Sequence, residues 1–265
     1  EVDHVWRAFV DDVHEPAEKR IESVMTDYLE GHAARIAKRV PKVLAQRAVG
    51  DDSIVFKIEG DWLSELVSEY AEGVALSKAV KDTLTEIYED AIGGAFESMP
   101  GFIVDDFPYD PERIDRLVDK HLGELIVDVP GGTRQGVKTV VTNGLAEGAT
   151  IAEIQAGIMS STSISSPMRA LRIARTEATK SVNAGGVAAW ESQAEAAGVE
   201  LVLTWRAQPN ARDSHKRLNG KQRDQKTGRW KSGMNTATAP GSFTGPNSAE
   251  LNINCRCFYT PKVNR

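Results

Sequence analysis

Apolar residues recur at three- and four-residue steps through the first two-thirds of the chain. Around residues 16–39 one such face comprises Ile21, Val24, Met25, Tyr28, Leu29, His32, Ile36 and Val40. Residues 80–97 repeat the pattern. Because residues at these steps share one side of an α-helix, the pattern predicts long amphipathic helices on a common core. Pro41 is expected to interrupt or kink its helix, and the Val129–Gly132 stretch is expected to be a break, since proline lacks the backbone donor.

Helix boundaries are marked by short local signals. Asp110-Pro111 favours a helix start, with an acidic N-cap and proline in the first turn. Thr150 and Glu153 have the spacing of a capping box. Pro167 begins a further helix, which is expected to run to about Ala197 and to end at Gly198.

After Gly198 the apolar period changes from helical to alternating. Residues 200–205 are predicted to form a strand, and residues 219–250 a long loop with short strands at most. Residues 251–259 are predicted to form a closing strand, with Ile253, Cys255 and Cys257 on one face. The fold class is therefore α+β: an elongated, mainly helical N-terminal region, followed by a compact domain of one long helix on a small antiparallel sheet.

The same pattern predicts two domains. Residues 1–130 form the helical N-terminal region, and residues 131–265 form the second domain. Within the latter, residues 131–166 are a helical lead-in, and residues 167–261 are the core. The chain begins at Glu1 and not at methionine, which is what a piece of a longer product would show.

Composition narrows the class of protein. Among 265 residues, 41% are hydrophobic and 26% are charged, which is typical of a soluble globular protein. No apolar run reaches the roughly 18 residues of a membrane span. The only cysteines are Cys255 and Cys257, one residue apart. A disulfide between such close neighbours is strained, so a reducing compartment is favoured over a secreted, disulfide-stabilised fold.

Charge is unevenly distributed. Residues 200–265 hold 12 Lys and Arg against 4 Asp and Glu, whereas the rest of the chain carries a net charge of −14. Such a basic tail favours an anionic partner, although a merely solvated surface is an equal alternative. Because its charges repel one another, the loop is expected to be mobile unless a partner holds it. The residues predicted to contact nucleic acid are Lys216, Arg217, Lys221, Arg223, Arg229 and Lys231.

Four short motifs follow one another near the C-terminus. They comprise Arg175, Thr176 and Glu177 in a helix; Trp205 in a strand; Arg212, Asp213, Ser214, His215 and Gly220 in a turn; and Asn254, Cys255, Arg256 and Cys257 in the closing strand. If Glu177 is buried against the sheet it must be paired, and Arg175, Arg212 or Arg256 could provide the cation. A structural network of this kind is our expectation, with no metal and no cofactor.

Two chemical alternatives remain open at this stage. His215, Cys255 and Cys257 could bind zinc, with Asp213 or Glu177 as the fourth ligand, although the usual CxxC spacing is missing. A nucleophilic cysteine with His215 as its base fits the residue types too, but a buried pair of cysteines in a strand is more often inert.

In this order, the four motifs resemble the phage head morphogenesis domain of the phage Mu F-protein family. The similarity is close over residues 168–261, with Asn210 where the family often has an acid. It implies a non-enzymatic minor head protein of a tailed bacteriophage, which acts in procapsid assembly with the portal protein or the major capsid protein. DNA packaging and DNA ejection are further roles that the resemblance allows, with packaged DNA as a partner.

The resemblance also implies a location in the virion head, in the host cytoplasm during assembly, with no membrane in the assembled head. The alternative from another class is a metal-dependent hydrolase or nuclease built on Glu177, Asp213, His215, Cys255 and Cys257. A plain nucleic-acid-binding module that uses the basic tail is a third interpretation.

Overall fold

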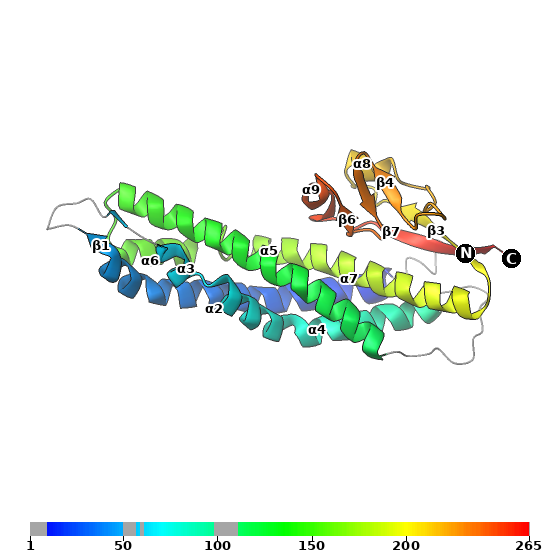
Figure 1. Ribbon diagram of the computed structural model, residues 1–265, viewed down its shortest axis with the longest axis horizontal. Helices are drawn as coiled ribbons and strands as arrows, with labels where there is room; N and C mark the ends of the chain where they lie inside the picture. The colour runs from blue at the N-terminus through cyan, green and yellow to red at the C-terminus, as the bar shows by residue number, and fades with distance from the viewer. Residues whose placement is uncertain (1–9, 50–56, 59–60, 98–110, 265) are drawn as a thin grey trace. The chain divides into compact units, whose positions relative to one another are not determined.

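The computed structural model describes residues 10–49, 57–58, 61–97 and 111–264, and its fold class is α+β (Figure 1). Long helices come first and short antiparallel strands follow, which confirms the predicted class. The expected N-cap Asp110 lies outside the described residues. Among the described residues, no helix combines the length and the apolar character needed to cross a membrane.

The helices and strands follow a simple order. The helical elements are the π-helix η1 (Val10–His14), α2 (Glu15–Arg47), α3 (Trp62–Leu66), α4 (Glu69–Glu97), α5 (Pro111–Ala146), α6 (Ile151–Ser160), α7 (Pro167–Ala196), α8 (Asp213–Lys216) and α9 (Ser248–Asn252). The strands are β1 (Ala48–Val49), β2 (Lys57–Ile58), β3 (Glu200–Arg206), β4 (Trp230–Ser232), β5 (Asn235–Ala237), β6 (Phe243–Thr244) and β7 (Phe258–Asn264).

The chain divides into two compact units, and four long helices contribute a stretch to each. The first unit comprises Glu1–Glu22, Asp82–Asp119 and Arg172–Arg265. The second unit comprises Ser23–Lys81 and Lys120–Leu171.

The second unit is built around an apolar core between α2, α3, α5 and α6. Its buried members are Ala33, Ile36, Ala37, Val40, Val43, Leu44, Leu66, Val67, Val137, Val141, Ile154, Ile158 and Ile164. The α6 helix starts at the predicted capping box: the Glu153 N–H donates to Thr150 Oγ1, and the Thr150 N–H donates to Glu153 Oε2. The helical periodicity therefore predicted both the elements and their buried faces.

Helix α2 is not interrupted at Pro41, although the sequence predicted that the proline would interrupt or kink it. The α2 helix continues through it to Arg47. A proline in a helix leaves the carbonyl four residues earlier without its backbone donor, which here is that of Ala37. The Gln155 side chain of α6 donates to this oxygen at 2.9 Å. A side chain from another helix thus restores the missing hydrogen bond.

The predicted break at Val129–Gly132 is likewise absent, since α5 runs unbroken from Pro111 to Ala146. The buried Arg169 side chain of α7 donates here to the Val129 carbonyl and to Thr133 Oγ1, both at 3.0 Å. These two hydrogen bonds join α7 to the part of α5 that contains Pro130.

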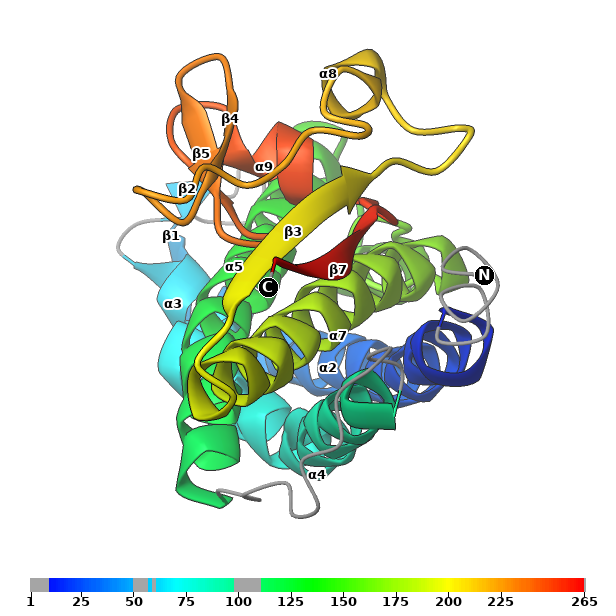
Figure 2. The same ribbon diagram turned by 90° about the vertical axis from the view of Figure 1, so that its right-hand side faces the viewer.

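The first unit places a small sheet against the last part of α7 (Figures 1 and 2). Strands β3 and β7 pair antiparallel, with Trp205 opposite Tyr259. The Trp190 and Tyr259 rings meet edge to face at 5.2 Å, and the Tyr259 hydroxyl donates to the Asn183 carbonyl. The predicted strand at 200–205 and the predicted end of α7 near Gly198 are both confirmed, with Gly198 at a φ of 64°.

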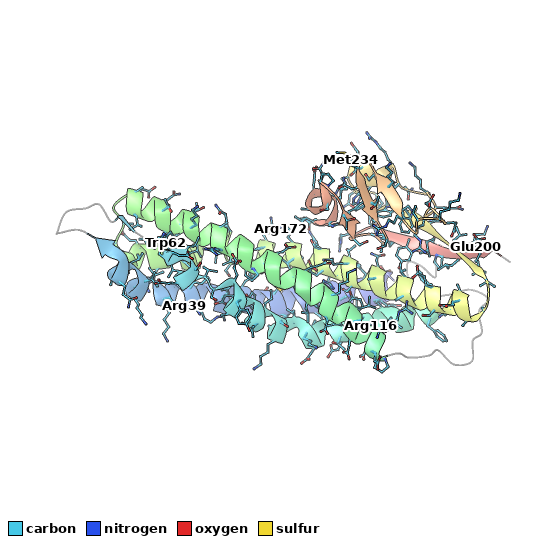
Figure 3. All side chains as sticks on the ribbon, in the orientation of Figure 1. Arg39, Trp62, Arg116, Arg172, Glu200 and Met234 are labelled. Carbon is cyan, nitrogen blue, oxygen red and sulfur yellow. The ribbon has the colours of Figure 1, made fainter. Side chains whose placement is uncertain are left out.

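The basic segment is held by hydrogen bonds along the other edge of β3, which differs from the expected mobile loop. The Trp205 N–H donates to Lys221 O at 2.9 Å, and the Gly220 N–H donates to Trp205 O at 2.8 Å. The Arg223 N–H donates to Leu203 O at 2.8 Å. Beyond it, β4, β5 and β6 form a three-stranded antiparallel sheet. Figure 3 labels Glu200 at the start of β3 and the exposed Met234 at the β4–β5 turn.

The predicted strand over residues 251–259 is wrong for most of its length. Residues 248–252 form the helix α9, and β7 begins only at Phe258. Asn254 between them has a φ of 57°, the left-handed conformation that a strand does not accommodate and that asparagine tolerates. Ile253 is 44% exposed, while Cys255 and Cys257 lie buried in an irregular segment.

Candidate functional site

One polar face of α7 holds the irregular segment 254–257 in place. The Asn254 N–H donates to Thr176 Oγ1 at 3.0 Å, and Thr179 Oγ1 donates to the Cys255 carbonyl. The Asn183 side chain donates to the Cys257 carbonyl at 3.1 Å. Steps of three and four residues put these α7 side chains on one helical face. Helix α7 therefore fixes the backbone that carries both cysteines.

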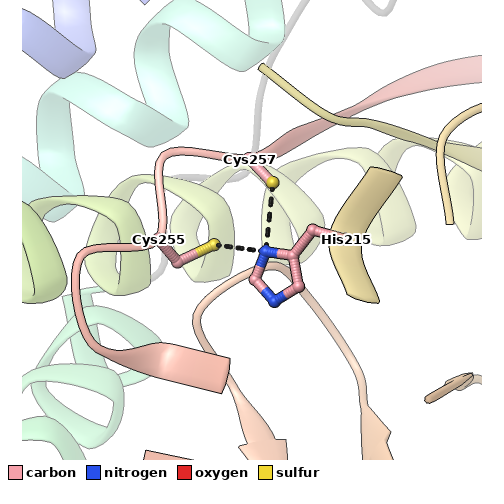
Figure 4. Close-up of side chains that lie close together, drawn as sticks. All are labelled: His215, Cys255 and Cys257. Carbon is pink, nitrogen blue, oxygen red and sulfur yellow. Dashed lines mark hydrogen bonds between the residues drawn. The ribbon is translucent and has the colours of Figure 1, made fainter. Parts of the chain in front are cut away.

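His215 faces both thiols from the one-turn helix α8 (Figure 4). Its Nδ1 atom lies 3.6 Å from Cys255 Sγ and 3.4 Å from Cys257 Sγ. The three ligand atoms all lie within 4.8 Å of one another, and each residue is at most 2% exposed. Residues 40 positions apart in the sequence thus form one buried cluster of a nitrogen and two sulfurs.

Aromatic rings enclose this cluster. The Phe243 ring stacks on the His215 ring at 5.6 Å, and the Trp205 ring meets it edge-on at 5.7 Å. Trp205 also contacts Trp230 at 5.4 Å and is itself fully buried. The enclosure separates the reactive side chains from solvent, so no substrate could reach them without displacing a core aromatic ring.

The two thiols differ in acidity. A hydrogen bond from the Cys255 thiol, followed by one from His215, lowers the pKa of Cys257 to about 5 against the opposing effect of burial. The same contact with Cys257, together with burial, raises the pKa of Cys255 well above its ordinary value. Without a bound metal ion, the two cysteines therefore carry one thiolate, on Cys257.

The arginines of the motifs pair with Glu18, which corrects the expected network around Glu177. Arg175 Nε donates to Glu18 Oε1 at 3.1 Å, and Arg256 Nη2 donates to Glu18 Oε2 at 2.9 Å. Arg212 donates to the Ile253 carbonyl. Glu177 is buried as expected, and its carboxylate lies 3.8 Å from Lys180 Nζ.

We predict that Glu18→Ala destabilises the protein more than Glu177→Ala does. Glu18 is 7% exposed, and its ion pairs with Arg175 and Arg256 join segments that are far apart in the sequence. The ion pair of Glu177 with Lys180 joins two residues of the same helix, three positions apart. Both arginines are about one-third exposed, so the loss from Glu18→Ala should be about 1–3 kcal/mol, below the ~3–5 kcal/mol typical of breaking a fully buried pair. Chemical denaturation of both variants measures the difference, and equal losses would contradict the prediction.

The other motif residues surround the cluster in supporting positions. Arg212 is the N-cap of α8, and Ser214 lies partly exposed on that helix. Gly220 has a φ of 78°, which favours glycine, at the turn back to β3. Asp213 is exposed, its carboxylate 3.9 Å from Lys216 Nζ. Of the five residues of the hydrolase alternative, the metal-ligating cluster in the described part of the chain contains only the histidine and the two cysteines.

The predicted nucleic-acid residues are not equally available. Arg223 makes an ion pair with Glu191 at 2.9 Å, and its side chain is only 13% exposed. Arg229 donates to Thr236 Oγ1 at 3.1 Å. Lys216, Arg217, Lys221, Arg229 and Lys231 are exposed, and so is Lys226, which the prediction omitted.

The sequence reading missed several residues that hold the site. Glu18 lies three residues before Ile21 and seven before Met25, so it shares their apolar helical face, and an acid in that register could have been flagged. Thr179 and Asn183 follow Thr176 at steps of three and four residues, so these polar side chains share one face of α7, which the sequence also could have indicated. Phe243 gave no signal, because its ring reaches His215 only through the fold of the β5–β6 turn.

The long helix, the tryptophan strand, the histidine turn and the segment with both cysteines all lie in one part of the chain, and this part is similar to a known protein family. Residues 135–260 match the family described as phage Mu protein F like protein, which confirms the resemblance. The match covers slightly less than half of the chain and includes the whole His–Cys cluster. The searches of curated proteins and of solved structures gave no match.

Proposed function

We propose that this chain is a non-enzymatic minor head protein, which associates with the portal during procapsid assembly of a tailed phage. The observation that carries the proposal is the family match over residues 135–260. The site geometry supports a structural role. The side chains able to do chemistry are enclosed by aromatic rings, while Asp213 lies in solvent.

Co-assembly in cells tests the association with the portal. The chain is expressed with the major capsid protein of the same phage, with and without the portal protein. Procapsids are then purified by sedimentation. The chain should co-sediment with particles that contain portal and be lost from portal-free particles. Equal retention in both would contradict portal association, and absence from both would contradict a role in the head.

A nuclease assay addresses the enzymatic alternative. The purified chain is incubated with linear DNA and with Zn²⁺, Mg²⁺ or Mn²⁺. No cleavage above that of a His215→Ala variant is expected, because the residues of the hydrolase alternative are not gathered at one accessible site. Cleavage that His215→Ala abolishes would favour the metal-dependent nuclease.

We further predict weak, sequence-independent DNA binding through the exposed basic segment. Contacts to phosphates carry no sequence information, and binding should fade between low and physiological salt. Changing Lys216, Arg217, Lys221 and Lys226 to Gln should weaken binding and reduce the slope of log affinity against log salt by up to about 0.9 for each lost phosphate contact. Fluorescence anisotropy with two unrelated duplexes measures both quantities.

A matched control carries the same change of charge elsewhere. Lys19, Lys38, Lys42 and Lys78 are all exposed on helices α2 and α4. Changing these four residues to Gln should leave the salt slope nearly unchanged. If both quadruple variants lose affinity equally, only net charge matters and the segment is no specific contact. If the unmodified chain binds neither duplex at low salt, the DNA contact is excluded.

A further inference from the structure

We infer that His215 Nδ1, Cys255 Sγ and Cys257 Sγ bind one zinc ion, which fastens α8 to the segment that precedes β7. The distances between the ligand atoms carry this inference. Tetrahedral zinc, with Zn–S near 2.3 Å and Zn–N near 2.0–2.1 Å, separates nitrogen from sulfur by about 3.6 Å. The observed separations are 3.6 and 3.4 Å. The three atoms also converge on one point from two elements (Figure 4).

Cysteine binds zinc as the thiolate, and metal binding itself displaces the thiol proton. Two buried thiolates need a compensating charge of +2, because unpaired buried charge is costly. A single divalent ion supplies it.

The donor set points to zinc among the common ions. Thiolates exclude the hard cations magnesium and calcium, and an imidazole together with two thiolates suits zinc. No fourth His, Cys, Asp or Glu ligand joins the cluster from the part of the chain that the structure describes. One small ligand such as water therefore completes the tetrahedron. Three protein ligands with one open position is the usual pattern of catalytic zinc, but each protein ligand here is at most 2% exposed, and we therefore assign the ion a structural role.

The metal explains why this irregular backbone is held so firmly. Cys255 and Cys257 belong to no strand, and α8 is a single turn of helix. A metal that joins residues 40 and 42 positions apart closes the loop that carries the basic segment. Loss of the ion should therefore loosen residues 207–257 and leave the second unit intact.

The test uses the full chain, purified under reducing conditions and reconstituted with Zn²⁺ after chelation. Elemental analysis should find about one zinc per chain. Cys255→Ser, Cys257→Ser and His215→Gln should each bind less than about a tenth of that amount. Asp213→Asn, next to the cluster in sequence but not part of it, should bind as the parent chain does. This control also separates the proposed ligand set from the earlier alternative with Asp213 as fourth ligand.

Two further measurements use the parent chain, so they do not depend on the folding of any variant. Because the chain has only two cysteines, alkylation kinetics with a small thiol reagent report on this site alone. Zn²⁺ should slow alkylation of the parent chain at least tenfold, and a chelator should reverse the effect. Co²⁺ in place of Zn²⁺ should give the intense visible absorption of tetrahedral cobalt with a thiolate charge-transfer band.

Zinc-independent alkylation, or a reconstituted parent chain without stoichiometric metal, would overturn the inference and leave a hydrogen-bonded thiol–imidazole cluster. Octahedral cobalt spectra would overturn it as well. None of these measurements depends on the proposed role in head assembly. Failure of the metal site is therefore distinguishable from failure of that proposal.

Discussion

Replacing Arg35 and Arg39 together by Met is expected to destabilise the second unit by about 1–3 kcal/mol, below the ~3–5 kcal/mol typical of breaking a fully buried pair because both arginines are more than one-third exposed. The carboxylate belongs to Glu72 on α4, whose side chain is 2% exposed. Arg35 Nη2 lies 2.7 Å from Glu72 Oε2, and Arg39 Nη1 lies 3.2 Å from Oε1. Methionine retains most of the apolar stem of each arginine, so the variant removes charge with little loss of packing.

The physical reason is visible in the pKa of Glu72. Burial acts to raise this pKa, but the Arg35 hydrogen bond and the positive charges of Arg35 and Arg39 outweigh it and lower the pKa, with a further lowering effect of His32 only where that histidine is protonated. Without the two arginines, burial still raises the pKa of Glu72, and only part of the lowering effect of His32 opposes it. The folded-state pKa of Glu72 should then lie above its unfolded value of about 4.5, so the variant should lose stability as the pH rises above about 4.5.

Chemical denaturation with two further variants completes the test. Adding Glu72→Gln to the double variant should recover part of the lost stability, because no unpaired charge remains. Lys38→Met with Lys42→Met removes two exposed charges from the same helix and should change stability by less than about 0.5 kcal/mol. If the double variant unfolds at the same denaturant concentration as this control, Glu72 does not depend on the arginines.

The helices were predictable because their signal is local and repeated. A residue at every third or fourth position reports the buried side of a helix, and Ile21, Met25 and Leu29 are all buried accordingly. The capping box at Thr150 and the glycine end at Gly198 are equally local, since their geometry depends on neighbours within four residues. Tertiary context did not override them.

The two prolines failed as helix breakers for the opposite reason. The missing hydrogen bond of Pro41 is replaced by that of Gln155, a residue 114 positions later, and nothing near the proline reveals this distant donor. At Pro130 the helix also continues, but the Arg169 bond to the Val129 carbonyl is not a substitute for the one that the proline removes, which belongs to the carbonyl four residues before it. A single sequence therefore indicates the local cost of a proline but not the tertiary contacts that let a helix continue through it.

The candidate site was predicted in composition but not in geometry. The sequence named His215, Cys255 and Cys257 as a group, yet it placed the cysteines in a strand with Ile253 on the same face. Both thiols do lie toward His215, but Asn254 is in the left-handed conformation, so the segment is no strand and Ile253 is exposed. The partner of Arg175 and Arg256 was also assigned to the wrong acid, because Glu18 lies 157 and 238 residues away from them. Pairs at such distance leave no local periodicity.

Acid should destabilise both units before the ordinary carboxylates titrate, and two buried histidines are the cause. Burial lowers the pKa of His14 to about 4, against a smaller raising effect of Glu18 and together with a smaller lowering effect of Arg256. Burial likewise lowers the pKa of His32 to about 4, against the raising effect of Glu72 and together with the lowering effects of Arg35, Arg169 and Arg39. Both side chains are therefore neutral in the folded protein near pH 6.

The sign follows from the protons bound in each state. Between pH 6.5 and 4 the unfolded chain protonates both histidines while the folded chain does not, so stability is full above pH 6.5 and is lost as the pH falls towards 4. A shift of 2.5 pKa units corresponds to about 3 kcal/mol for each histidine. For each histidine, about 2 kcal/mol of this stability should be lost between pH 6.5 and 5, where carboxylates with ordinary pKa values are still mostly ionised.

Denaturation curves at half-unit pH steps, with a chelator present, give the slope of stability against pH. His32→Gln should flatten that slope between pH 6.5 and 5 by about half, His14→Gln by a similar amount, and the double variant should be nearly flat. The neutral side chain matters for His14 in particular, because its Nε2 lies 3.0 Å from Thr179 Oγ1, the hydroxyl that also holds the Cys255 carbonyl. Protonation there would add a buried cation beside the segment of the two cysteines. A parent chain whose stability is constant from pH 7 to 5 would contradict the assignment of both histidines.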